Sequence, residues 1–329
     1  MGKMKALVCK EFGTPDILVM EDIAEPEIQK GMVKIQVHSV GLNFPDTLMI
    51  AGKYQFKPPF PFSPGMESAG IVTEIGEGVT NIKVGDRVMA NHGHGGFAEY
   101  VLAPEDGTYV IPDNMPFDQA AGFPVTYGTT YHALVDRGNL KKGEVLLVHG
   151  AAGGVGLNAV ELGKALGATV IGTVGSDEKM DIVRQYGADH VINYSTESIK
   201  DRVKELTGGK GADVIYDPVG GDAFDQSMRC INWEGRLLVI GFASGRIAEL
   251  PTNLALLKGC SVIGVFWGEF ARRTPEKNRA NFKAMLDMVE KGEIKPHVSM
   301  HFPLEKGADA MKALLSRKST GKVIITVKE

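Results

Sequence analysis

VLLVHGAAGGVG, at residues 145–156, is the stretch that decides the fold. An apolar segment of strand length runs into a glycine-rich turn, and apolar residues then recur at helical spacing. With alanine in the first position, the turn follows the G-x-G-x-x-G pattern of dinucleotide-binding proteins. Gly153 lets the backbone approach a pyrophosphate, Gly156 lets helix and strand pack closely, and the helix N-terminus offers unpaired N–H groups. We therefore predict cofactor contacts at Gly153, Gly154, Val155 and Gly156, the alternative being a glycine-rich turn of another α/β fold.

Similar strand and helix patterns follow this stretch. Apolar runs alternate with helical patterns after residue 118, as ATVIGTV, HVINY, ADVIYDPVG, RLLVIGF and SVIGVFW. Repeated β-α units of this kind imply a parallel sheet covered on both faces. Residues 274–291 read as a helix, and the segment from residue 298 returns to a strand, a helix at 304–317 and the strand KVIITV.

The first third of the chain has a different pattern of apolar residues. Short alternating segments recur between glycine and proline turns over residues 5–110, which predicts a small β-rich unit. The proline-rich residues 57–64 cannot join a central strand or a helix interior, so a loop is expected there. The last strands of the chain are expected to rejoin this unit.

Bulk composition narrows the class of protein. A chain of 329 residues exceeds what one hydrophobic core usually supports, so two domains are expected. A net charge of -4 with scattered Lys and Arg argues against nucleic acid as a partner. No signal peptide or run of about 18 apolar residues is evident, so we predict no membrane segment. Three widely spaced cysteines suggest neither a disulfide framework nor a thiolate zinc site, which fits the reducing cytoplasm.

The residues after the second strand of the dinucleotide-binding unit favour NADPH over NADH. Proteins that bind NAD usually carry an acidic residue about 20 positions after the glycine turn. Here Gly175 and Ser176 take that place. The missing carboxylate leaves room for a 2'-phosphate, to which Ser176, Lys179 and Tyr194 can donate hydrogen bonds or charge. The alternative is that Asp177 is the acidic residue and Lys179 a solvated charge.

The order of these motifs resembles the medium-chain dehydrogenase/reductase superfamily. VGLNFPD and PGMESAGIVTEIGEGV are followed by GDRV and HGAAGGVG, so the resemblance covers practically the whole chain. Within it the sequence is most similar to the zinc-independent quinone oxidoreductase branch, also called zeta-crystallin-like. The resemblance implies an α/β protein with a GroES-like β-rich catalytic domain (residues 1–122 and 295–329), an inserted Rossmann NADPH-binding domain (residues 123–294) and a substrate cleft between them.

The resemblance also implies that no zinc is bound. Zinc alcohol dehydrogenases of this superfamily carry a cysteine-histidine pair where this chain has Leu42 and Asn43, and a histidine where it has Met66. An isolated H-x-H pair, His92 and His94, could bind a metal on its own, but a third ligand is not evident. We predict no metal site.

Two residues of the first domain are implied by the resemblance to lie near the nicotinamide and the substrate, Asn43 and Tyr54. Tyr54, with an ordinary pKa near 10, can donate a proton to a developing oxyanion or enolate. Asn43 and Asp46 are expected to orient and support, and Glu67 resembles a remnant of the metal-site framework of related enzymes. The alternatives are a loop aromatic packed on prolines for Tyr54 and a turn residue closing a strand for Asn43.

The resemblance selects further cofactor contacts beyond the ends of the later strands, where ligands of open α/β sheets lie. These contacts are Val219, Ile240, Gly241, Phe242, Ala243, Val265, Phe266 and Trp267. Thr126 and Tyr127, at the hinge between the domains, are further candidates, and Arg317 matches a phosphate-contacting arginine of the quinone reductase relatives. The aromatic members of the set could instead be core residues, and Arg317 could be a surface charge.

The function expected from this resemblance is NADPH-dependent reduction of quinones or related small electrophilic carbonyl compounds. One rival is reduction of an enone or enoyl thioester, for which Arg272, Arg273 and Lys277 could form a coenzyme A phosphate patch if they are not simply a solvated helix start. Another is a non-catalytic, crystallin-like NADPH-binding protein. The apolar strand CSVIGVFW is expected to be an exposed sheet edge that needs cover, which predicts a homodimer.

Overall fold

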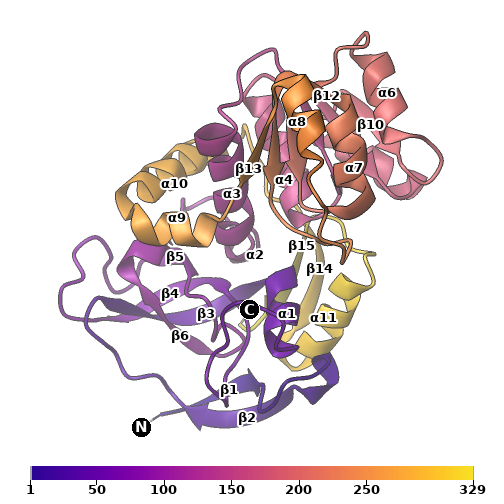
Figure 1. Ribbon diagram of the computed structural model, residues 1–329. Helices are drawn as coiled ribbons and strands as arrows, with labels where there is room; N and C mark the ends of the chain where they lie inside the picture. Colours follow the sequence, from indigo (N-terminus) through magenta and orange to yellow (C-terminus); the bar gives the residue numbers. More distant parts are fainter. Residues whose placement is uncertain (1, 329) are drawn as a thin grey trace. The chain divides into compact units, whose positions relative to one another are not determined.

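The computed structural model describes residues 2–328, and the chain divides into two compact units (Figure 1). Unit 1 comprises Met1–Val125 and Phe282–Glu329, and unit 2 comprises Thr126–Asn281. Both crossings between the units lie inside helices, α3 (Pro124–Tyr131) and α10 (Pro275–Glu290). The predicted combination of a β-rich unit with a Rossmann-type unit is confirmed.

Unit 2 is built on a six-stranded parallel sheet in the order β10-β9-β8-β11-β12-β13. Its strands are β8 (Val145–Val148), β9 (Thr169–Val174), β10 (His190–Asn193), β11 (Ala212–Asp217), β12 (Ile231–Val239) and β13 (Ser261–Gly264). The helices that follow them are α4 (Gly154–Ala165), α5 (Met180–Gln185), α6 (Ile199–Leu206), α7 (Gly221–Cys230), α8 (Thr252–Lys258) and α9 (Trp267–Arg273). The strand order reverses between β8 and β11, and ligands of open α/β sheets bind at such a reversal.

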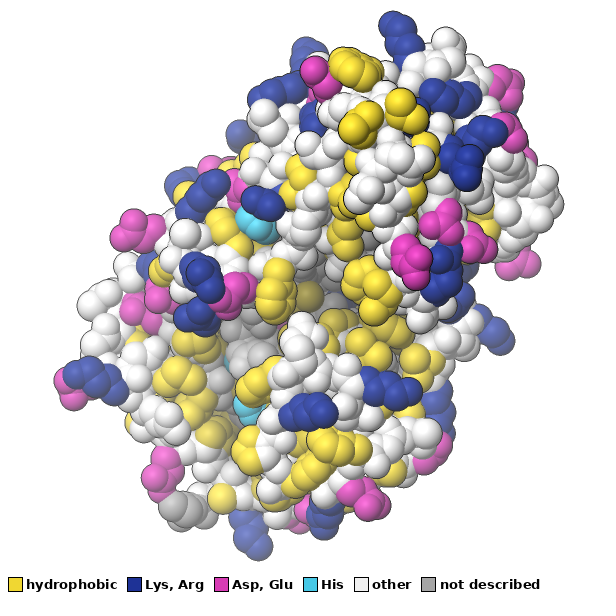
Figure 2. Space-filling view, viewed as in Figure 1, with side chains coloured by type: hydrophobic (Ala, Val, Ile, Leu, Met, Phe, Trp, Pro, Cys, Tyr) yellow, Lys and Arg dark blue, Asp and Glu magenta, His cyan; other side chains and the backbone are white. Residues whose placement is uncertain are grey.

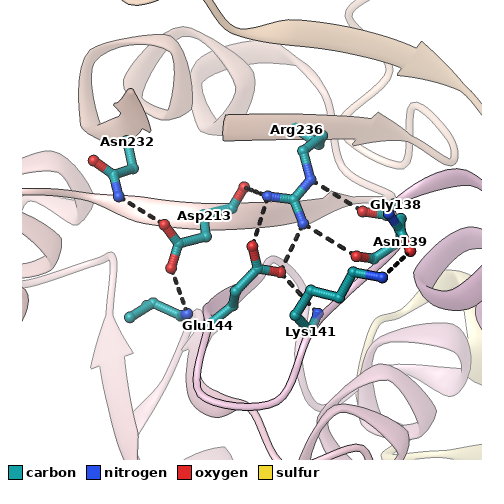
Figure 3. A network of polar contacts seen from close by, with 8 residues as sticks. Gly138, Asn139, Lys141, Glu144, Asp213, Asn232 and Arg236 are labelled. Carbon is teal, nitrogen blue, oxygen red and sulfur yellow. Dashed lines mark hydrogen bonds and ion pairs between the residues drawn. The ribbon is translucent and has the colours of Figure 1, made fainter. Parts of the chain in front are cut away.

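A polar network closes the amino-terminal edge of this sheet (Figure 3). Arg236 of β12 donates to both carboxylate oxygens of Glu144, at 2.9 and 2.6 Å, and through Nε to the backbone oxygen of Gly138 at 3.0 Å. Asp213 accepts from Asn232 and from the backbone N–H that starts β8. The network fixes the turn before β8, at the end of the sheet opposite to the glycine turn.

Unit 1 contains a seven-stranded sheet in the order β14-β15-β3-β4-β5-β7, with β6 also paired to β3, and a separate β1-β2 hairpin. Its strands are β1 (Lys3–Val8), β2 (Val19–Ala24), β3 (Met32–Leu42), β4 (Glu67–Ile75), β5 (Arg87–Asn91), β6 (Tyr100–Pro104), β7 (Thr108–Val110), β14 (Val298–Pro303) and β15 (Lys322–Thr326). Its helices include α1 (Phe44–Ile50), α2 (Phe117–Ala121) and α11 (Gly307–Leu315). Because β15 pairs with β3, the end of the chain does rejoin the N-terminal unit, as predicted.

The proline-rich segment of unit 1 is a loop, as expected. Residues 57–64 contain no helix or strand and make a single bridge, between Phe62 and Cys9. On the face shown in Figure 2, basic and acidic side chains are interspersed. Across residues 2–328, none of the helices has the length and apolar character to traverse a bilayer.

Candidate cofactor and substrate sites

The glycine turn between β8 and α4 has the backbone geometry of an anion cradle. Gly153 is the exposed N-cap of α4, and because it has no side chain it leaves the first-turn N–H groups uncapped. A Cβ on Gly156 would lie 2.1 Å from the Gly150 oxygen, so only glycine lets the helix start this close to the strand. Gly154 and Val155 are partly exposed beside it. The turn therefore fits a pyrophosphate, which needs close backbone approach and free N–H donors.

The ends of β9 and β10 bring together the residues expected to bind a 2'-phosphate. A Cβ on Gly175 would lie 2.6 Å from the Tyr194 hydroxyl oxygen, so the half-exposed tyrosine lies over this glycine. Ser176 and Lys179 flank the same turn, and both are partly exposed. One carboxylate oxygen of Asp177 accepts a hydrogen bond from the buried Asn193 side chain at 2.7 Å. Asp177 is thus turned toward the end of β10, and hydroxyl and amino groups flank the turn.

The ends of β11, β12 and β13 carry the remaining predicted contacts of unit 2. Both Val219 and Gly220 donate their N–H groups to Asp217 Oδ1, which fixes the turn after β11. Phe242 and Phe266 are exposed after β12 and β13, at 43% and 57%. The residues that accompany them at these strand ends are Ile240, Gly241, Ala243 and Val265. They therefore share the carboxyl edge of the sheet with the glycine turn.

Three predicted contacts have side chains that belong to the core of unit 2. Tyr127 is 1% exposed, and its hydroxyl donates to Glu161 at 2.6 Å. Thr126 is buried and accepts from Asn158, and the Trp267 indole N–H donates to Asn278 in the interior. The cofactor contacts expected at these three positions stay predictions, and in the structure their side chains are part of the interior of unit 2.

Asn43 lies in unit 1, between the end of β3 and the start of α1. Its backbone N–H donates to the Asp46 carboxylate at 2.8 Å, and its side-chain nitrogen donates to Glu67 at 2.7 Å and to the Gly41 oxygen at 3.3 Å. Asn43, Asp46 and Glu67 are all buried. The structure therefore brings Glu67 together with Asn43 and Asp46, the two residues that were expected to orient and support.

Lys322, the first residue of β15, completes this cluster and was not predicted from the sequence. Its ammonium donates to the Leu42 oxygen, to Asn43 Oδ1 and to Glu67 Oε1, each at 2.8 Å. The sequence places Lys322 and Glu67 255 positions apart, and no local pattern signals their contact. A lysine that stands at the start of an apolar strand looks like a solvent-facing residue.

Tyr54 lies in the loop after α1 and packs, partly buried, against the core of unit 1. Burial, with a smaller contribution from the nearby Asp46 charge, raises the pKa of its phenol above 10. Asp46 is completely buried, which raises the pKa of its carboxyl to about 7 although it accepts from the N–H groups of Asn43 and Gly65. At neutral pH the phenol of Tyr54 is therefore protonated.

The side chain of His92, the first histidine of the H-x-H pair, is hydrogen-bonded within unit 1. His92 is partly buried, and because its Nδ1 faces the His94 carbonyl oxygen, that nitrogen is the donor and Nε2 accepts from the Ser68 hydroxyl. Within residues 2–328, no three His, Cys, Asp or Glu side chains are grouped so that they could hold a metal ion.

Arg317, exposed after α11, has a left-handed backbone with φ 58°.

Comparisons with known proteins cover both units. Residues 29–113 match the alcohol dehydrogenase GroES-like domain and residues 154–291 match the family described as zinc-binding dehydrogenase. The chain is 43% identical to a quinone oxidoreductase-like protein 2 homolog of Nematostella vectensis, over 99% of this chain and 89% of that protein. It is 35% identical to the quinone oxidoreductase of Homo sapiens, over 98% of this chain and 97% of that protein.

A solved structure gives the same result. The quinone oxidoreductase of Escherichia coli, complexed with NADPH, superposes with a TM-score of 0.91 at 31% identity and covers 98% of this chain and 100% of its own. Similarity at this level over nearly the whole length identifies a family and not only a fold. The chain belongs to the quinone oxidoreductase family of the medium-chain dehydrogenases/reductases, which are oxidoreductases.

Proposed function

We propose that the protein is an NADPH-dependent, zinc-independent reductase of quinones or related small electrophilic carbonyl compounds. The proposal rests on the turns at the carboxyl edge of the unit 2 sheet. There an uncapped glycine turn at Gly153 is followed, one strand away, by Gly175 and Tyr194, and Asp177 of the same turn is hydrogen-bonded to Asn193. The NADPH that the Escherichia coli relative binds supports the same cofactor for this chain.

The residues present would hold each part of NADPH by ordinary contacts. The pyrophosphate would accept from the N–H groups at the start of α4. The 2'-phosphate would accept from Ser176, Lys179 and Tyr194, and we propose Arg317 as a further phosphate contact. The strand ends from Val219 to Phe266 would hold the nicotinamide half. Bound NADPH supplies the hydride or electrons, so the protein has to orient, exclude water and supply a proton.

We propose Tyr54 as the proton donor and Asn43 as an orienting residue. The raised pKa of Tyr54 keeps the phenol protonated at neutral pH, so the hydroxyl is available to an oxygen on which charge develops. Asn43 is held by its neighbours and therefore has a fixed geometry to offer a ligand.

The structure weakens the case for a coenzyme A thioester as the substrate. Arg272 and Arg273 both donate to Glu269 in the same helix turn, and Lys277 pairs with Asp136 at 2.8 Å. A phosphate would have to compete with these carboxylates for the three basic side chains. Quinones and simple enones need no such patch.

An NADPH-oxidation screen tests the proposal. Ortho-quinones, para-quinones, enones and enoyl thioesters are offered as acceptors, with NADPH and NADH compared at equal concentration. Turnover with a quinone and a preference for NADPH are expected. Turnover only with enoyl thioesters would replace the substrate class, and tight NADPH binding without any turnover would favour a non-catalytic binding protein.

A single substitution tests the proton donor. Replacing Tyr54 by Phe is expected to lower kcat at least tenfold, about 1.4 kcal/mol in barrier height. Tyr100→Phe is the matched control, because Tyr100 also lies in unit 1 and its hydroxyl accepts from Gln36. Unchanged turnover in Tyr54→Phe would leave this tyrosine as a wall of the substrate site.

We propose a homodimer formed at β13, which is one edge of the unit 2 sheet. The hydrophobic helix α8, which ends just before β13, supports this choice, because Leu256 and Leu257 are 78% and 67% exposed. Location in the cytoplasm stays a prediction.

A further inference from the structure

Lys322 is a buried lysine whose three ammonium hydrogens are all used inside unit 1. Its acceptors are the Leu42 oxygen, Asn43 Oδ1 and Glu67 Oε1, each at 2.8 Å, and the residue is 5% exposed. An ammonium group is costly to bury unless it is paired and hydrogen-bonded. Glu67, which is fully buried, supplies the compensating charge.

Two glycines make room for this cluster. A Cβ on Gly41 would lie 2.5 Å from Glu67 Oε1, and a Cβ on Gly122 would lie 2.8 Å from the Lys322 side chain. The second oxygen of Glu67 accepts the Val125 N–H at 2.7 Å. Both ends of the ion pair are therefore fixed by backbone that cannot give way without a change of strand or helix position.

The same contacts leave the Asn43 amide only one orientation. Its two N–H hydrogens are donated to Glu67 and to the Gly41 oxygen, and its oxygen accepts from Lys322. A flipped amide would set its N–H groups against the ammonium and its oxygen against the carboxylate. Because both N–H hydrogens are donated, the polar atom that this side chain can offer a ligand is Oδ1.

We propose that Lys322 is a positioning residue that fixes the Asn43 amide, so that Asn43 meets its ligand as a hydrogen-bond acceptor and never as a donor. The group that Asn43 recognises is then itself a donor, such as a hydroxyl or carboxamide N–H. It is not the oxyanion that forms during reduction. This inference rests on the proposed function in taking NADPH and its acceptor as the ligands.

The decisive variant is the double substitution Lys322→Met with Glu67→Gln. It removes both charges and so avoids an unpaired buried carboxylate. In this variant the side-chain oxygen of the new glutamine accepts the Val125 N–H, so its NH2 group faces Asn43. Two NH2 groups would then face each other, and the Asn43 amide therefore turns over. We expect a melting temperature within a few degrees of wild type, with kcat/KM and the dissociation constant for NADPH each worse by about tenfold or more.

Lys34→Met is the matched control. Lys34 is also a nearly buried lysine of unit 1, paired with Glu25 and Glu74 at 2.9 Å, and it has no contact with Asn43 among its bonds. Wild-type kinetics are expected for this variant. A folded Lys322→Met/Glu67→Gln protein with wild-type kcat/KM and NADPH affinity, or an equal loss in Lys34→Met, would overturn the inference.

A readout independent of turnover separates this inference from the proposed function. The Asn43 side-chain amide protons, assigned by their absence in Asn43→Asp, are expected to exchange slowly with solvent in the wild type and fast in the double variant. Fast exchange in the wild type would overturn the positioning role even if NADPH is oxidised. Slow exchange without any NADPH oxidation would refute the proposed function and leave the positioning role standing.

Discussion

Arg317 holds a backbone conformation that suits glycine. It follows the C-cap of α11 with φ 58°, the left-handed geometry that usually carries glycine at this place in a helix end. A side chain there costs about 1 kcal/mol, part of which returns because glycine has more freedom in the unfolded chain. A strained arginine on the surface is consistent with a role in binding.

Replacing Arg317 by Gly is therefore expected to raise the free energy of unfolding by up to about 1 kcal/mol while weakening the binding of NADPH but not of NADH. Urea unfolding and fluorescence titration measure the two effects. Arg317→Ala is the control, since it removes the guanidinium and keeps the backbone strain. Equal stability of the Gly and Ala variants would show that φ is relaxed in solution.

His92 gives unit 1 a pH dependence of known sign. Burial lowers the pKa of its imidazole from 6.5 to about 4. Between these values the unfolded chain binds a proton and the folded protein does not. The stability that the neutral ring contributes is thus complete above pH 6.5 and is lost as the pH falls toward 4, by about 1.4 kcal/mol per pH unit.

His92→Asn is expected to flatten the fall in unfolding free energy between pH 6.5 and 4.5, as measured by urea unfolding at several pH values. Asparagine keeps a donor for the His94 oxygen and cannot titrate. His190→Asn changes an exposed histidine and should leave the pH dependence as in the wild type. A wild-type slope in His92→Asn would assign the acid sensitivity to other groups.

The sequence shows why Asn43 was found and Lys322 was not. Asn43 stands in a motif, VGLNFPD, that resembles other members of the family. Lys322 depends on a contact between strands far apart in the chain, and single-residue spacing carries no information about such a contact. Burial of Tyr127 was missed for a similar reason, because its partner Glu161 lies on another helix, whereas for Trp267 a place in the core was one of the two alternatives.

At the scale of elements, strands that are buried on both faces were predicted well, whereas β2 and α1 of unit 1 were missed. The β2 strand has Val19 and Met20 exposed and pairs only with β1, so it lacks the apolar alternation of a core strand. The α1 helix has seven residues, too few for a helical period to stand out. It depends instead on the N-terminal bond between Asn43 and Asp46.

The Arg236 network shown in Figure 3 is an element-scale anchor for the turn before β8. Its Arg236 and Glu144 side chains are only 21% and 24% exposed, and the pair is bidentate. Arg236→Met is expected to lower the free energy of unfolding by about 1–3 kcal/mol, as measured by urea unfolding. Arg273→Met, which breaks a solvated pair with Glu269, should leave the unfolding midpoint unchanged. Equal effects in the two variants would argue against the anchor.

At the scale of the whole molecule, the oligomeric state shows whether two chains pair at the edge strand β13. The wild type is expected to sediment at twice the 35.4 kDa mass of the chain, and Leu256→Glu/Leu257→Glu at the mass of one chain, because the charges would have to be buried in the dimer. Val84→Glu is the control, at a residue of unit 1 that is 60% exposed. A dimer that survives the double substitution would place the interface elsewhere.

The ion pair between Glu67 and Lys322 also sets an order of events during translation. All six strands of unit 2 lie within the continuous segment Thr126–Asn281, so this unit is complete while the ribosome is still adding residues. Unit 1 has its buried carboxylate early and receives the counter-ion only with β15. A nascent or truncated chain that stops before β15 therefore cannot close unit 1 around a neutral interior, and we expect it to remain open to proteases until β15 has been added.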